Sequence, residues 1–201
     1  MATSYYTLAG EGRAFTSNQL SWAAAYSAAT ADGVAANLIP AGAKNGANNF
    51  SIGRGFFPFD TSLLPASATI TAAVLHLYRD DSITAFTNTD TVALHVVSST
   101  EANPASLAVG DYDATGVVSG GSINFASTSN TTYFEITLNE TARGWITKAG
   151  NTLLAIRVSN DLTNTDATGS NVISLQARGD ANPPYLEITY TEGAGNFFQF
   201  I

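Results

Sequence analysis

The sequence predicts an all-β protein, an antiparallel β-sandwich with one short helix, from three observations. Apolar and polar residues alternate over short segments, as in strands that bury one face. Glycine, asparagine, aspartate and proline separate these segments, where turns are needed. Charged residues make up only 12 % of the chain and hydrophobic residues 45 %. The remaining polarity comes mainly from threonine, serine and asparagine, which is typical of a neutral-polar β protein.

Strand patterns are clearest from residue 56 onward. The expected strands are 56–59, 70–78, 91–98, 133–138, 152–159, 172–177 and 185–190. Their alternation assigns one set of side chains to a common core. This expected core is Phe57, Phe59, Leu75, Leu77, Phe134, Ile136, Leu138, Trp145, Leu154, Ile156, Leu186 and Ile188.

One helix is expected between Asn139 and Lys148. Asn139 is a good N-cap, Glu140 follows in the first turn, and Gly150 supplies a stop. Trp145 would make this helix a plug over one end of the sandwich. The alanine-rich stretch 21–36 has helical propensity, but its Thr, Ser, Gly and Asp content favours strand and loop there.

No proline-rich linker, charge block or internal repeat divides the chain. We therefore expect a single domain over residues 1–192, of which 1–53 form irregular N-terminal strands and loops. Residues 193–201 are expected to be an apolar C-terminal tail.

Several stretches carry a resemblance to a known family. Residues 54–78 read RGFFPFDTSLLPASATITAAVLHLY and residues 182–190 read NPPYLEITY. Both resemble DNRLRE-type β-sandwich domains of bacterial surface proteins and polysaccharide-active enzymes. Residues 136–150 and 154–161 resemble a subgroup of short tailed-bacteriophage proteins. The resemblance implies a jelly-roll-like sandwich used as a binding or structural module, without shared catalytic residues.

Charge argues against nucleic-acid binding. Eight Lys and Arg residues against sixteen Asp and Glu give a net charge of −8, and no basic stripe accompanies the aromatic residues. The absence of cysteine excludes a disulfide scaffold, a thiolate zinc site and a cysteine nucleophile. No secretory signal is visible at the start, and the apolar stretches are shorter than the ~18 residues of a spanning helix.

Catalytic and metal motifs are not found in the sequence. The two histidines, His76 and His95, lie within expected strands, and no serine sits in a Gly-x-Ser-x-Gly elbow. Two histidines cannot form a three-histidine metal site. We therefore expect neither an enzyme nor a cofactor. Seven aspartates can be calcium ligands or, the favoured interpretation, turn formers. They are Asp80, Asp81, Asp90, Asp111, Asp113, Asp161 and Asp166.

Two sets of residues are candidates for binding. Four N-terminal aromatic residues could form a sugar-stacking platform or, the favoured alternative, belong to the core and sheet edges. They are Tyr5, Tyr6, Trp22 and Tyr26. The other set is the apolar end of the chain, which is expected to dock on another subunit or to fold back as one more strand. It comprises Phe197, Phe198, Phe200 and Ile201.

Together these features favour a non-enzymatic structural protein of a tailed-phage virion, a capsid decoration protein or a tail-associated adhesion module. Its expected partners are a major capsid or tail protein, further copies of the chain and a host-surface glycan, without nucleic acid or membrane insertion. The alternative is a secreted carbohydrate-binding module or bacterial surface protein, located outside the cell.

Overall fold

The structure, a computed structural model, describes residues 1–7, 11–44, 47–86 and 92–192. Its strands in this part of the chain are β1 (Ala2–Thr7), β2 (Gly12–Gln19), β3 (Gly33–Ala35), β4 (Ala41–Lys44), β5 (Phe50–Asp60), β6 (Thr69–Phe86), β7 (Ala93–Ser98), β8 (Gly121–Asn124), β9 (Tyr133–Thr137), β10 (Asn151–Val158), β11 (Ser170–Leu175) and β12 (Tyr185–Thr191). The helices there are α1 (Trp22–Tyr26), α2 (Glu140–Arg143), α3 (Ser159–Leu162) and the 3-10 turns η1 (Val109–Asp111) and η2 (Phe125–Ser127). The protein is therefore all-β, as predicted.

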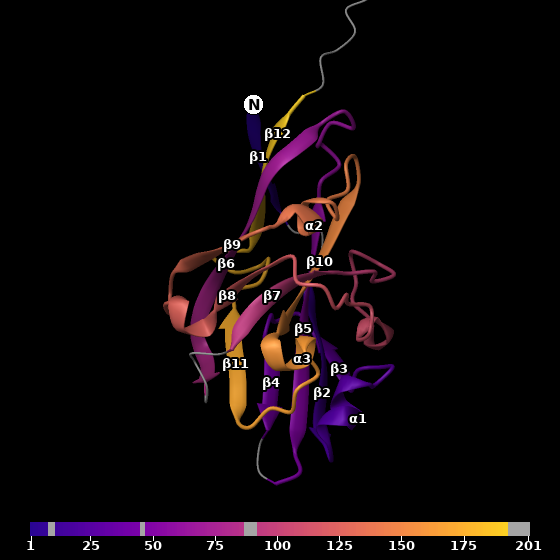
Figure 1. Cartoon of the computed structure of the whole chain (residues 1–201), viewed down its shortest axis with the longest axis vertical. Helices are drawn as coiled ribbons and strands as arrows, with labels where there is room; N and C mark the ends of the chain where they lie inside the picture. Colours follow the sequence, from indigo (N-terminus) through magenta and orange to yellow (C-terminus); the bar gives the residue numbers. More distant parts are fainter. Residues whose placement is uncertain (8–10, 45–46, 87–91, 193–201) are drawn as a thin grey trace, which may run out of the picture.

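Every recorded strand pair is antiparallel, and β6 joins two layers. The first part of β6 pairs with β12 on one edge and β9 on the other, and β12 pairs with β1. The last part of β6 pairs with β11, from which the order continues through β4, β5, β10, β7 and β8. Figure 1 shows β1, β12 and the start of β6 at the upper end and β2, β3 and β4 at the lower end. This arrangement is consistent with a β-sandwich.

The main core lies between the two layers. Leu75 of β6, Ile136 of β9 and Leu186 of β12 contact the same buried cluster as Phe57 of β5 and Ile156 of β10. Of the twelve residues expected in the core, eleven are buried, as the strand alternation predicts. Trp145 is the exception, because it is only partly buried.

A second core covers the other face of β5 and β10. Phe56 of β5 and Ala155 of β10 lie in it, together with Trp22 of α1 and Tyr112, which follows η1. Strand β5 is consequently buried on both faces. A strand that buries both of its faces needs a further element packed on the second face. Here α1 and the segment around η1 provide that layer.

The helix predictions are corrected in two places. Three short α-helices occur in the described residues where one was expected, and α1 lies in the stretch 21–36 assigned to strand and loop. Ser21 caps α1 by accepting the Ala24 N–H at 3.2 Å, and the buried Trp22 and Ala25 anchor it. Tertiary burial therefore stabilises a helix of only five residues.

The expected helix from Asn139 to Lys148 is shorter than predicted. Asn139 does cap it, accepting the Ala142 N–H at 3.0 Å, but α2 ends at Arg143. Trp145 then packs on Gly120, where an added Cβ would lie 2.5 Å from the indole ring. The Trp145 N–H donates to the carbonyl of Ala142, three residues back, at 3.0 Å, so the α-helical hydrogen-bond pattern has already ended there. No described helix is long and apolar enough to cross a membrane.

Three charged side chains are buried within the second core. Arg54 of β5, Arg157 of β10 and Asp161 of α3 are 3 %, 2 % and 0 % exposed. Arg54 Nη2 donates to Asp161 Oδ1 at 2.8 Å and Arg157 Nε donates to Asp161 Oδ2 at 2.7 Å. The Arg54 guanidinium also lies 4.1 Å from the centre of the Tyr112 ring. Asp161 is one of the candidate calcium ligands, but both of its carboxylate oxygens accept hydrogen bonds from the two arginines.

Replacing Asp161 with Asn should destabilise the fold by about 3–5 kcal/mol, because two guanidiniums would remain buried without their carboxylate. Chemical denaturation measures the free energy of unfolding. The control is Asp113→Asn, at an exposed position, which should change it by less than about 0.5 kcal/mol. Equal effects of the two substitutions would contradict the role assigned to Asp161.

Acid should remove the contribution of Asp161 to stability. Burial alone raises the pKa of Asp161, but the hydrogen bonds and charges of Arg157 and Arg54 outweigh burial and hold that pKa below its usual value of 3.8. The contribution is complete at pH values above 3.8 and is lost as the pH falls towards the lower pKa of the folded state. The melting temperature of the native protein should therefore fall more steeply with acid than that of Asp161→Asn. Parallel profiles would contradict this assignment.

Candidate functional site: an outward tyrosine face

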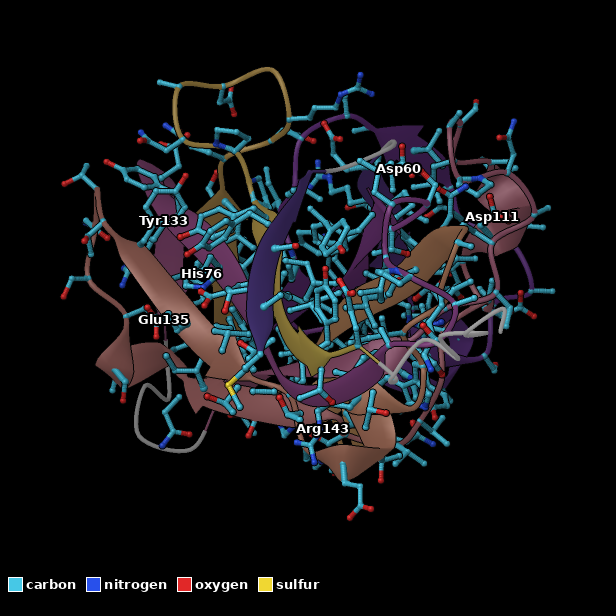
Figure 2. All side chains as sticks on the ribbon, turned by 90° about the horizontal axis from the view of Figure 1, so that it is seen from above. Asp60, His76, Asp111, Tyr133, Glu135 and Arg143 are labelled. Carbon is cyan, nitrogen blue, oxygen red and sulfur yellow. The ribbon has the colours of Figure 1, made fainter. Side chains whose placement is uncertain are left out.

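The outward face of β1, β12, β6 and β9 carries an unusual set of side chains. We call it the tyrosine face, and it consists of Tyr5, Tyr78, Tyr133, Tyr185, His76, Glu135 and Glu187. The strand register brings these side chains side by side, because Tyr185 of β12 is opposite His76 of β6 and His76 is opposite Glu135 of β9. Their neighbours Leu186, Leu75 and Ile136 point into the core. Figure 2 shows His76, Tyr133 and Glu135 together on one side of the molecule.

His76 is the centre of this face. Its ring stacks on that of Tyr185, with centroids 4.2 Å apart and an interplanar angle of 9°. Its Nε2 lies 3.0 Å from Glu187 Oε2, and its Nδ1 lies 3.6 Å from Glu135 Oε1. Because a carboxylate only accepts hydrogen bonds, Nε2 carries the proton in the contact with Glu187. Two strands on either side of β6 thus fix the imidazole.

The tyrosines pack edge to face around this centre. The Tyr133 ring lies 5.6 Å from that of Tyr185 and 5.2 Å from that of Tyr78, and the Tyr5 ring lies 5.9 Å from that of Tyr185. The Tyr133 hydroxyl donates to the carbonyl of Pro183 at 3.0 Å. Such arrangements suit the ring quadrupoles and hold each ring in place.

Part of the face is open to solvent. Tyr5 is 65 % exposed and Tyr133 36 %, while the Glu135 side chain is 65 % exposed and that of Glu187 29 %. Burial raises the pKa of Tyr133 and of Tyr185, and neighbouring tyrosines add to the effect at both. Both phenols therefore stay protonated at neutral pH. The face presents aromatic surface, hydroxyl groups and carboxylate acceptors.

A groove of about 410 Å³ lies beside Tyr5, at the edge of this face. Ser4, Tyr5 and Tyr6 of β1 line one wall, and Asp60 and Leu63 line the other. Hydrogen bonds from the side chain and backbone of Ser62 lower the pKa of Asp60. Leu63 is 88 % exposed. The groove thus adds a second carboxylate-bearing surface next to the tyrosines.

The four aromatic residues proposed for sugar stacking do not lie together. Tyr5 belongs to the tyrosine face, but Tyr6, on the same strand, points inward and is 6 % exposed. Trp22 is 2 % exposed and packs on Phe50, and the partly buried Tyr26 lies near Arg54. Figure 1 shows β1 and α1 at opposite ends of the molecule.

The apolar end of the chain, with Phe197, Phe198, Phe200 and Ile201, lies outside the described residues. Its docking on another subunit stays a prediction. The other histidine, His95 of β7, is half-buried between the hydroxyls of Ser119 and Ser159, at 3.0 and 3.2 Å. Burial lowers the pKa of His95. Among the residues that the structure describes, no group of three or more His, Asp or Glu side chains is arranged to hold a metal ion.

Part of this site has a sequence signal. The alternation in 133–138 and 185–190 places Tyr133, Glu135 and Glu187 on the outward faces of their strands. It does not reveal that β9 and β12 both pair with β6, which brings these residues to His76. The sequence did not indicate Tyr185 as a site residue for that reason, because its stacking on His76 depends on the pairing of β12 with β6.

Comparison with models of protein families gave no match, and comparison with curated protein sequences gave none either. The resemblance to DNRLRE-type domains and to short tailed-phage proteins therefore stays an expectation that depends on the residues quoted for it.

Proposed function

We propose that the protein is a non-enzymatic binding module whose tyrosine face binds a neutral oligosaccharide. The observation that carries this proposal is the cluster of partly exposed tyrosine rings from four strands, flanked by Glu135 and Glu187. A pyranose ring has an apolar face of C–H groups and a rim of hydroxyls. Tyrosine rings provide large, rigid apolar contact for the first, and carboxylates accept hydrogen bonds from the second.

Charge favours a neutral ligand. The chain has a net charge of −8, and the tyrosine face carries the carboxylates of Glu135 and Glu187. An anionic polysaccharide would therefore be repelled. The groove beside Tyr5 has room for a further sugar unit, with Asp60 as an acceptor. Tyr5 connects the two surfaces.

Rigidity also supports binding. The stack of His76 on Tyr185 and the hydrogen bond to Glu187 hold the face before a ligand arrives. Side chains that are already ordered lose little conformational entropy on association, so less of the contact energy is cancelled. Strands of one sheet carry all seven residues of the face, which keeps their spacing fixed.

The setting expected from the sequence is a tailed-phage virion, with a secreted or bacterial surface protein as the alternative. Both settings use contact with a cell-surface glycan, and the proposed binding face fits an adhesion module in either. Capsid decoration is a proposal that depends on the apolar end of the chain.

Binding is tested with the purified protein on an array of neutral and anionic glycans, followed by calorimetry with a glycan that binds. Tyr5→Ala and Tyr133→Ala should each weaken binding about two- to tenfold, since a lost aromatic contact costs about 0.5–1.5 kcal/mol. Tyr5→Phe should retain most of the affinity, because it keeps the ring. Glu135→Gln should weaken binding as well.

The matched control is Leu20→Ala, which removes a 79 % exposed side chain next to α1 and should bind like the native protein. The proposal fails if no neutral glycan is bound, or if the tyrosine variants bind as tightly as the control. Preference for a quaternary ammonium ligand over every sugar would also overturn it, because aromatic rings with carboxylates can bind such cations.

Removal of residues 196–201 tests the assembly role. If three or four large apolar side chains are buried against another subunit at about 1.5–3 kcal/mol each, deletion should reduce oligomer size or incorporation into particles. Circular dichroism and melting of the monomer should stay unchanged. A destabilised monomer that assembles normally would show instead that this segment is a strand of its own domain.

A further inference from the structure

A groove of about 260 Å³ lies over β2, β5, β4 and β11, which are neighbours in one layer. Figure 1 shows β2 and β4 at the lower end of the molecule, whereas β1 and β12 of the tyrosine face lie at the upper end. The groove is therefore remote from the proposed glycan site. Its volume is slightly below the ~300 Å³ at which typical small-molecule sites begin, so it suits a small ligand.

Strand register explains the apolar floor of this groove. Phe15 of β2 is opposite Gly53 of β5, which is opposite Ala41 of β4. Ala41 is in turn opposite Val172 of β11. Residues opposite each other on paired strands share a face of the sheet, so these four form one row, and all four line the groove. The glycine and the alanine in the middle of the row leave room above the sheet.

A cation and two hydroxyl-bearing residues complete the lining. Arg13 lies two residues before Phe15 on β2, so the two side chains share a face of the strand. The Arg13 guanidinium lies over the Phe15 ring, 4.7 Å from its centre. Ser17 of β2 and Ser51 of β5 also line the groove. The groove thus combines an apolar floor with a positive charge and hydrogen-bonding groups.

Arg13 has no compensating carboxylate in the part of the chain that the structure describes. Its Nε is buried and has no hydrogen-bond acceptor there. Burial lowers the pKa of Arg13, whereas at the buried Arg54 the carboxylate of Asp161 opposes the same effect. Asp32 accepts the Ser17 N–H at 2.6 Å instead. Because a guanidinium stays charged in proteins, a half-buried one without a counter-ion gains from contact with an anion.

We propose that this groove binds a small organic acid, with the carboxylate at Arg13 and the apolar body over Ala41 and Gly53. Arg13 lines the groove and is only partly buried, so an anion in the groove can contact its guanidinium. Arginine donors match the geometry of a carboxylate. The net charge of −8 acts from a distance, and physiological salt screens charges beyond about 8 Å. Contact with Arg13 therefore outweighs the distant acids.

Phenylpropionate is the probe, because it joins one carboxylate to an apolar ring. Its titration into the isotope-labelled full chain at neutral pH is followed by nuclear magnetic resonance of the backbone N–H groups. Signals from β2, β4 and β5 should shift with a dissociation constant of about 1 mM. Phenylpropanamide, which has the same shape without the charge, should bind about tenfold more weakly or worse. Acetate, which lacks the apolar body, should be weakened to a similar extent.

Two variants locate the ligand. Arg13→Gln should weaken binding of phenylpropionate about tenfold or more. Its melting temperature should equal or exceed that of the native protein, because it removes a half-buried charge without a partner, and this shows that the variant is folded. Ser51→Val narrows the groove without changing its charge and should weaken binding as well. The matched control is Lys148→Gln, which removes one positive charge at an exposed position after α2 and should bind like the native protein.

The proposal is overturned if phenylpropionate shifts no signal from the groove, or if phenylpropanamide or acetate binds as tightly. It is also overturned if Arg13→Gln binds like Lys148→Gln. Shifts of the same signals with protein concentration alone would show that a second copy of the chain fills the groove, which would contradict the proposal too. Glycan binding is measured without organic acids, so either result leaves the tyrosine face unaffected.

Discussion

The packing around the second core depends on Asp161, which is buried between Arg54 and Arg157. Neither arginine can be buried without a carboxylate, and the carboxylate comes from a helical turn directly after β10. The remaining guanidinium donors bind carbonyl oxygens, including those of Tyr26 and Tyr112. This one group of charges therefore joins two central strands to α1, α3 and the loop around η1.

The two layers have different outer surfaces. The outer face of β5 and β10 is covered by the second core, with Trp22 and Tyr112 packed over it. The outer face of β6, β9 and β12 carries the tyrosine face, and within the described residues no second core covers it. The outward side chains of one layer are therefore partly open to solvent, while the outer face of the other layer is buried. Strand β6 connects the two layers, because it pairs with β12 in one layer and with β11 in the other.

The tyrosine face depends on strand pairing. The tyrosine face lies on strands, and its residues are fixed by register and by contact with His76.

Local periodicity and capping chemistry were enough to predict the strand pattern from residue 56 onward, eleven of the twelve inward residues and the Asn139 cap. The sequence by itself did not determine α1, since a five-residue helix there depends on burying Trp22. It also left Asp161 as a turn former or calcium ligand. Its role is visible only in the folded chain, because its partner Arg54 is 107 residues away. The tyrosine face is a similar case: a period of two assigns each side chain to a face, but strand order decides which faces become neighbours.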